Sequence, residues 1–145
     1  MLHAIDTDFL VAIEIRDHVF HKNADALLNR LLDEGHELAV APQTLAEFVH
    51  VATDGRRMKE PLSMEEALAR AEHWWQAREV FRIYPAGETV TTWIGWLRDY
   101  RLGRKRLLDT MLAATCAEHG ISVLISNNAA DYEVFKKFTI LTYAS

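Results

Sequence analysis

The segment LHAIDTDFL, residues 2–10, gives the first indication of the fold. Residues 2–5 form a short apolar run bounded by polar residues, which is typical of a strand buried in a parallel sheet. Two carboxylates, Asp6 and Asp8, follow this strand directly. Ligands of open α/β sheets bind beyond the carboxyl ends of the strands, so an acid placed there is a candidate site residue. Either aspartate could instead cap the helix that follows.

The remainder of the chain alternates between short apolar runs and segments with helical periodicity. Strands are expected at residues 37–41, 80–84, 121–126 and 139–142. Helices are expected at residues 23–34, 42–52, 63–78, 88–100 and 107–119, followed by a short one from about residue 131. This alternation predicts an α/β fold with a central, mainly parallel sheet flanked by helices.

Length and composition limit the class of protein. The 145 residues suit a single domain, 1–145, and 50% hydrophobic with 26% charged residues fits a globular chain. A single cysteine, Cys116, excludes an intramolecular disulfide and a cysteine-rich zinc site. There is no basic leader and no apolar stretch near the roughly 20 residues that span a bilayer, so we expect a cytoplasmic protein without membrane contact. The net charge of −5 restricts nucleic-acid binding to a local basic patch.

Three further carboxylates occupy positions from which they could join Asp6. Glu47 lies in the first turns of the helix after the second strand, and Asp131 follows the clearest strand of the sequence. Asp109 begins a strongly apolar helix, where an unpaired carboxylate is costly. Each acid alone has a simpler interpretation: a solvated side chain at Glu47, a helix cap at Asp131 and a favourable helix-dipole contact at Asp109. Only their joint placement at one edge of the sheet predicts a shared site.

Convergence of these four carboxylates would produce strong mutual repulsion. Hard divalent cations with oxygen ligands relieve such repulsion, and Mg²⁺ or Mn²⁺ is the natural choice. A cation of this kind can activate water and neutralise the charge that develops on a phosphate. Carboxylates without His or Cys partners therefore indicate phosphodiester chemistry more than zinc-dependent hydrolysis.

A basic segment, RLGRKR at residues 101–106, lies directly before Asp109 and holds four of the 16 Lys and Arg residues. A nuclease needs cations beside its acids to hold the phosphates of its substrate. Arg104, Lys105 and Arg106 are therefore candidates for binding nucleic acid. The alternative is a solvated loop that neutralises an acidic surface.

Four stretches together resemble the PIN domain family, in particular the VapC-type toxins of bacterial and archaeal toxin–antitoxin pairs. They are IDTDFL at residues 5–10, PQTLAEF at 42–48, LLDTMLAATCAEHGI at 107–121 and VLISNNAADYEVF at 123–135. Their order, their intervals and the length of the chain fit the family, so the resemblance covers essentially the whole chain.

This resemblance implies a three-layer PIN-like fold and a metal-dependent endoribonuclease, with Mg²⁺ or Mn²⁺ held by Asp6, Glu47, Asp109 and Asp131. Thr7 would support Asp6, and water activated by the metal would cleave RNA to leave 3′-hydroxyl and 5′-phosphate ends. The basic segment with Arg104, Lys105 and Arg106 would then bind RNA. The resemblance also implies a homodimer, inhibited by a small antitoxin whose C-terminal segment covers the acidic pocket.

The chain departs from the family at one motif. Members often carry TxD or TRN before the last aspartate, whereas SNN stands here at residues 126–128. Asn128 could ligate a metal through its carbonyl or through a water, but it brings no charge. The fourth ligand is therefore left open between Asp131 and Asn128.

Two other functions are compatible with the sequence. DTDFL at residues 6–10 also resembles the Asp-x-Asp motif of haloacid-dehalogenase phosphatases, in which the first aspartate is a nucleophile and the second a general acid. That family carries a later Gly-Asp-rich motif after a strand, and VLISNNAADY at residues 123–132 has no glycine and one acid. The second alternative is a PIN-like domain that binds RNA or a partner without cleaving.

Two remaining patterns receive structural interpretations. His18 and His21 are spaced like a metal pair, but no third His or Cys lies near enough in sequence to complete a known pattern, so we expect surface histidines. A stripe at helical spacing predicts packing in the core or at a dimer interface; it consists of Trp93, Trp96, Leu97 and Tyr100.

Overall fold

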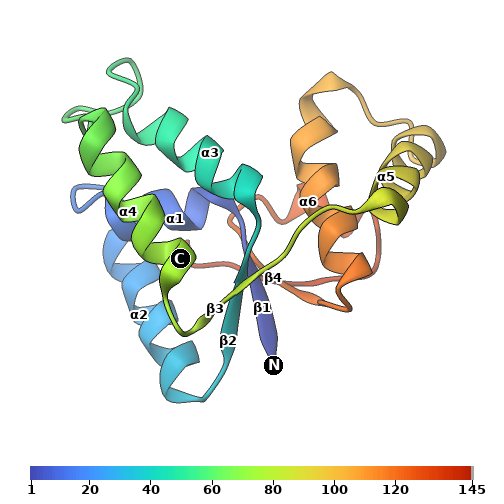
Figure 1. Ribbon diagram of the computed structural model, residues 1–145, viewed down its shortest axis with the longest axis horizontal. Helices are drawn as coiled ribbons and strands as arrows, with labels where there is room; N and C mark the ends of the chain where they lie inside the picture. The colour runs from blue at the N-terminus through green and yellow to red at the C-terminus, as the bar shows by residue number, and fades with distance from the viewer. Residues whose placement is uncertain (145) are drawn as a thin grey trace.

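The computed structural model describes residues 1–144, and Ser145 lies outside the described residues. Within that range the chain forms a five-stranded sheet with the order β3-β2-β1-β4-β5 (Figure 1). The strands are β1 (Leu2–Ile5), β2 (Glu37–Val40), β3 (Val80–Arg82), β4 (Val123–Ile125) and β5 (Thr139–Leu141). All pairings between these strands are parallel, so the predicted mainly parallel sheet is fully parallel over the described residues.

The first strand, β1, lies in the middle of the sheet. Ala4 is in register with Ala39 of β2 on one side and with Leu124 of β4 on the other. Because the strands run in the same direction, the residues that follow β1, β2 and β4 meet at one edge of the sheet. Asp6 follows β1 at that edge.

Helices cover both faces of the sheet and give the predicted three layers. One face carries α1 (Thr7–Glu14), α2 (His21–Asp33), α3 (Pro42–Ala52) and α4 (Met64–Gln76). The other carries α5 (Gly87–Asp99), the 3₁₀ turn η1 (Arg104–Arg106), α6 (Leu107–Glu118) and α7 (Ala130–Glu133). In Figure 1 the helices form two arms, with α3 and α4 in one and α5 and α6 in the other.

Successive side chains of the central strand feed the cores on opposite faces of the sheet. Ile5 packs in the core beneath α1 to α4, where Phe9 and Phe48 are also buried. Ala4 packs in the core beneath α6 and α7, which contains Cys116 and Phe135. Cys116 is fully buried, and burial raises the pKa of its thiol to about 12.

Local sequence signals explain where several helices begin and end. A capping box begins α4, with Ser63 and Glu66 each accepting a hydrogen bond from the other's backbone N–H. Gly120 has a φ of +68°, a left-handed conformation that suits glycine, and it follows the end of α6. The following strand is shorter than predicted, because the N–H of Ile121 still bonds the carbonyl of Cys116 at the end of that helix.

The aromatic stripe on α5 packs largely within the chain. The Trp96 ring stacks on the Phe135 ring with centroids 4.6 Å apart, and the Tyr100 ring meets Phe135 edge-on at 5.5 Å. Nε1 of Trp93 donates a hydrogen bond to the carbonyl of Leu107 at 2.9 Å. These contacts join α5 to α6 and to the segment after α7, but Trp93 and Trp96 are half-buried and Tyr100 is 38% exposed, so the stripe is not fully buried in the core.

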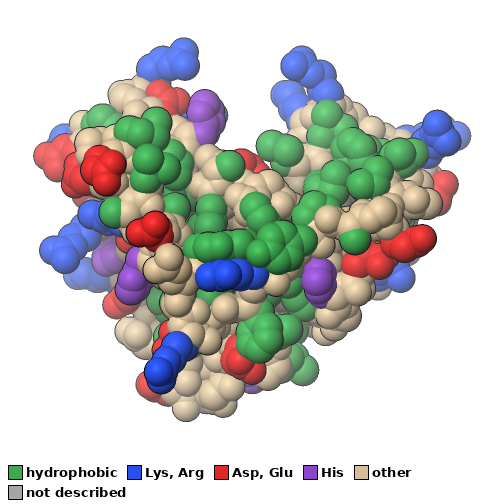
Figure 2. Space-filling model, in the orientation of Figure 1, with side chains coloured by type: hydrophobic (Ala, Val, Ile, Leu, Met, Phe, Trp, Pro, Cys, Tyr) green, Lys and Arg blue, Asp and Glu red, His purple; other side chains and the backbone are tan. Residues whose placement is uncertain are grey.

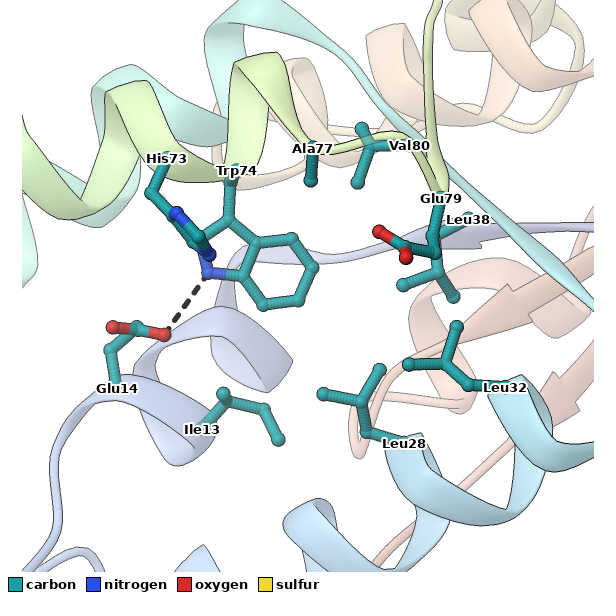
Figure 3. Close-up of a pocket in the computed structure, with 10 residues that line it drawn as sticks. All are labelled: Ile13, Glu14, Leu28, Leu32, Leu38, His73, Trp74, Ala77, Glu79 and Val80. Carbon is teal, nitrogen blue, oxygen red and sulfur yellow. Dashed lines mark hydrogen bonds between the residues drawn. The ribbon is translucent and has the colours of Figure 1, made fainter.

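A cavity of about 220 Å³ lies between α1, α2 and α4 (Figure 3). Its wall is mainly apolar, and Figure 3 shows Ile13, Leu28 and Trp74 around it. Nε1 of Trp74 donates a hydrogen bond to Oε2 of Glu14 at 3.1 Å, which ties α4 to the end of α1. The residues of this cavity do not include any of the predicted site residues.

None of the helices formed by residues 1–144 has the length and apolar character needed to cross a bilayer.

Candidate active site

The carboxyl end of β1 leads directly into Asp6, which is the N-cap of α1. Its Oδ1 accepts a hydrogen bond from the backbone N–H of Thr7 at 2.8 Å. Its Oδ2 accepts a hydrogen bond from the Ser126 hydroxyl, also at 2.8 Å, just beyond β4. Asp6 is only 6% exposed, and burial raises its pKa because loss of hydration disfavours the charged carboxylate. The same side chain is therefore both a helix cap and a candidate functional acid.

Asp8 is a second acid at this edge, and it is not among the four carboxylates that the sequence predicts for the shared site. Its Oδ2 accepts a hydrogen bond from the backbone N–H of Asn127 at 2.8 Å. Its Oδ1 is buried and has no hydrogen-bond partner among residues 1–144. Burial, followed by the nearby charge of Asp6, raises the pKa of Asp8 to about 6. Asp8 thus lines the cavity although it is not one of the four predicted acids.

Glu47 on α3 and Asp109 on α6 belong to the same electrostatic cluster. Burial and the charge of Asp6 both raise the pKa of Glu47. Burial raises the pKa of Asp109 to about 7, with further contributions from Asp6, Asp131 and Glu47. These mutual effects require the acids to lie near one another, as their predicted position at one sheet edge implies.

A cavity of about 330 Å³ contains most of these acids. Its wall includes Asp6, Asp8, Glu47 and Asp109, together with the predicted supporting residues Thr7 and Asn128. Because the wall takes residues from both α3 and α6, the cavity lies between the two arms of the molecule. Figure 2 shows the molecule deeply notched between these arms.

Asp131 does not line this cavity. Its Oδ1 lies 3.7 Å from Nε of Arg106, and the guanidinium of Arg106 also donates to the backbone carbonyl of Asp131. The charge of Asp131 nevertheless raises the pKa of Asp109 and of Asp6. Of the two candidates for the fourth ligand, Asn128 is on the cavity wall, and its backbone N–H donates to Oγ of Ser126 at 2.9 Å.

Tyr132 contacts two of the acids, although it does not line the cavity. Its side chain is fully buried, and its hydroxyl makes a long hydrogen bond of 3.5 Å to Oδ1 of Asp109. The same hydroxyl hydrogen-bonds Asp6 and lowers the pKa of that carboxyl. No sequence signal distinguishes this tyrosine from an ordinary core aromatic residue, because its role depends on the position of its hydroxyl group relative to the two acids.

The three basic residues of η1 differ in their surroundings. Arg104 and Lys105 are exposed beside the start of α6. Arg106 is half-buried and directed toward Asp131. Arg104 and Lys105 are therefore accessible to a nucleic acid, whereas Arg106 also has a partner within the chain.

Two cavity residues come from segments that the sequence interprets as surface. His18 is half-buried, its Nδ1 accepts the backbone N–H of Phe20 at 3.0 Å, and burial lowers its pKa. Arg57 lies in the turn after α3 and lines the same cavity. A turn's direction is set by backbone geometry, so the spacing of residues in the sequence gives no sign of either placement.

The charge and the donor atoms of the site suit a hard divalent cation. Burial, and after it the charges of the neighbouring acids, raise the pKa values of Asp8 and Asp109, and Oδ1 of Asp8 is a buried acceptor without a partner among residues 1–144. Across the same range, however, no three His, Cys, Asp or Glu side chains are arranged to hold a metal ion. The carboxylates share one cavity without forming a coordination shell.

The fold and this cavity define a three-layer α/β domain with an acidic site at the carboxyl edge of a parallel sheet. The PIN domain profile matches residues 4–137, and the chain belongs to the PIN domain family. Among curated protein sequences, none is significantly similar to the chain. The haloacid-dehalogenase alternative finds no support in the family match.

Several solved structures share the fold at low sequence identity. VapBC2 from Rickettsia felis, bound to a DNA fragment from its promoter, has a TM-score of 0.69 and 13% identity, covering 99% of this chain and 100% of its own. VapC20 from Mycobacterium tuberculosis, a Sarcin-Ricin loop cleaving toxin, has a TM-score of 0.67 and 16% identity over 90% and 93% of the two chains. A toxin–antitoxin complex from Klebsiella pneumoniae has a TM-score of 0.62 and 16% identity over 99% and 98%.

Proposed function

We propose that this protein is a metal-dependent endoribonuclease of the VapC type, the toxin of a toxin–antitoxin pair. The observation that carries the proposal is the cavity at the strand ends, whose wall includes Asp6, Glu47 and Asp109. Membership of the PIN domain family supports nuclease chemistry at that position. The similarity to a toxin that cleaves the Sarcin-Ricin loop makes RNA the proposed substrate.

Asp6, Glu47 and Asp109 would hold Mg²⁺, or Mn²⁺ in its place, with Asn128 or Asp131 completing the set. When bound, the cation would lower the pKa of water and neutralise charge on the phosphate. The chain's own contribution is to keep Asp6 fixed through the Thr7 N–H and the Ser126 hydroxyl. Since both oxygens of Asp6 have a donor, its orientation does not depend on the cation.

A cleavage assay tests this function directly. The wild-type protein should cleave single-stranded RNA with Mg²⁺ or Mn²⁺ and lose that activity with EDTA. Asp109→Asn should abolish cleavage while the protein stays folded, because the substitution removes one of several crowded negative charges. Absence of divalent-dependent cleavage by the wild type, together with unfolding of the variant, would contradict the proposal.

An antitoxin is the proposed protein partner, by analogy with the Klebsiella pneumoniae complex. Its C-terminal segment would cover the acidic cavity, and the toxin itself would be a homodimer acting on RNA in the cytoplasm. Coexpression with the product of the adjacent upstream gene should give a stable complex without nuclease activity. Sedimentation of the isolated toxin should give twice the mass of one chain, and a monomer would contradict the dimer.

A second candidate function is a PIN-like domain that binds RNA or a partner without cleaving. It is favoured by the lack of a ready-made coordination shell among residues 1–144. Titration with Mn²⁺ distinguishes the two functions, since the nuclease should bind the ion through its carboxylates. A protein that binds RNA but no Mn²⁺ would belong to the second class.

A further inference from the structure

We propose that Arg57, in the turn between α3 and α4, binds a backbone phosphate of the RNA strand that enters the acidic cavity. This inference rests on the proposed function and assigns a second RNA-binding surface to it, across the cavity from the predicted segment with Arg104 and Lys105. Arg57 is the only Lys or Arg among the described residues on the cavity wall.

A polyanion that enters this cavity meets unfavourable charges on most sides. Asp6, Asp8, Glu47 and Asp109 all contribute to the wall, and the chain carries a net charge of −5. Electrostatic attraction therefore has to come from a cation held at the cavity and kept from pairing with those acids. Arg57 meets both requirements because its partner, Asp54, does not line the cavity.

Asp54 organises the turn and orients the arginines. Its backbone carbonyl accepts the N–H groups of Arg57 and Met58 at 3.1 and 2.9 Å, and its Oδ1 accepts the N–H of Arg56 at 2.9 Å. Its carboxylate lies 3.6 Å from Nε of Arg56 and 3.5 Å from Nε of Arg57. One carboxylate shared between two guanidinium groups leaves one positive charge in excess at this turn.

The Arg57 side chain is accessible as well as oriented, with 57% of its surface exposed. A guanidinium with exposed N–H groups can donate paired hydrogen bonds to phosphate oxygens, for which its planar shape is suited. Lys and Arg side chains stand at the tips of both arms in Figure 2, on the two sides of the notch. An RNA strand lying across the notch would thus contact cations on both arms.

Arg56 provides a matched control. It belongs to the same turn, pairs with the same aspartate and is 95% exposed, but it does not line the cavity. Substitution of either arginine by glutamine removes one charge from the turn and one of the two ion pairs of Asp54. A difference between the two variants therefore reports on position in the cavity and not on the charge of the turn.

The experiment measures the affinity for a short fluorescein-labelled single-stranded RNA of mixed sequence by anisotropy, in EDTA and in an Asp109→Asn background that prevents cleavage. Arg57→Gln should weaken binding about tenfold and reduce the salt dependence by about 0.7 in log–log slope, the values for one charge-assisted contact to a single strand. Arg56→Gln should change the affinity less than about twofold, and Arg57→Lys should recover part of the loss.

Equal losses for Arg56→Gln and Arg57→Gln would overturn the inference, because only the charge of the turn would then matter. Unchanged RNA affinity in folded Arg57→Gln would also overturn it and would leave this arm to a protein partner. Either of these binding results is compatible with RNA cleavage by the wild-type protein. The role of Arg57 can therefore be disproved while the proposed nuclease function stands. If the wild-type protein shows no divalent-dependent cleavage, that result would instead contradict the proposed function.

Discussion

The hydroxyl of Ser126 lies 2.8 Å from Oδ2 of Asp6 and donates to it a hydrogen bond between two residues 120 positions apart. Ser126 is fully buried, and its Oγ also accepts the backbone N–H of Asn128 at 2.9 Å. This one side chain thus links the acid that follows β1 to the backbone that follows β4. The position of Asp6 is fixed by the sheet through this link.

Ser126→Ala should lower the free energy of unfolding by about 1–3 kcal/mol, because it leaves a buried carboxylate oxygen of Asp6 without its donor and the N–H of Asn128 without its acceptor. Denaturant unfolding in EDTA measures this loss without any contribution from a metal. Ser122→Ala is the control, since Ser122 is exposed just before β4. Equal effects of the two substitutions would contradict a specific role for the Ser126 hydroxyl.

The stability of the metal-free protein should fall as the pH rises from about 4 to about 7. The folded protein holds a proton on Asp109 up to a pKa of about 7, whereas the unfolded chain loses it near the ordinary pKa of 3.8. Between these values the folded state binds more protons, so raising the pH favours unfolding; above them the effect is constant. Asp8, with a folded pKa of about 6, acts in the same direction.

Asp109→Asn removes the larger of these contributions. The variant should be more stable than the wild type by roughly 1–3 kcal/mol at neutral pH and should show a shallower dependence on pH. Thermal unfolding in EDTA at several pH values measures both effects, with Asp25→Asn on the surface of α2 as the control. If Asp109→Asn destabilises the protein at neutral pH, the charges at this site are not crowded as the structure indicates.

Tyr132→Phe should leave the fold intact and change the titration of Asp6. The buried ring is retained, but the carboxylate of Asp6 loses a hydrogen-bond donor that lowers its pKa. Binding of Mn²⁺ requires the deprotonated form, so the pH of half-maximal binding should rise. Calorimetric titrations across the neutral range measure the shift, and exposed Tyr84→Phe should show none.

Arg106→Gln should chiefly reduce stability, whereas Arg104→Gln should chiefly reduce RNA affinity. Arg106 is paired with Asp131 and with its backbone carbonyl, so its loss leaves a half-buried acid without its cationic partner. We expect a cost of about 1–3 kcal/mol, measured by denaturant unfolding. If Arg106→Gln retains full stability and binds RNA as weakly as Arg104→Gln, Arg106 is primarily an RNA-binding residue.

The fold could be predicted where the sequence reports directly on burial or on the ends of helices. The capping box at Ser63 and Glu66 and the glycine at Gly120 mark the limits of α4 and α6 through local contacts. Strand lengths are harder to predict from the sequence because they depend on which strands pair. Ile121 is apolar enough for a strand, but its N–H bonds the end of the preceding helix.

The site could be predicted where an acid occupies a position that an ordinary acid would avoid. Asp6 at a buried strand end and Asp109 in an apolar helix met that condition, and both line the cavity. The sequence does not predict the roles of Asp8, Tyr132 and Arg57. These roles depend on where a side chain or a turn is directed in space. Likewise, nothing in the basic run distinguishes Arg106, which turns toward Asp131, from its neighbours.

The middle position of β1 determines when during synthesis the cavity can form. The first strand leaves the ribosome long before β4, its partner on one side, has been translated. Until then a nascent chain has neither the hydroxyl that holds Asp6 nor the backbone N–H that holds Asp8. Long-range pairing of this kind completes late, so a chain terminated early lacks the assembled cavity, and only a finished polypeptide can possess the activity proposed for it.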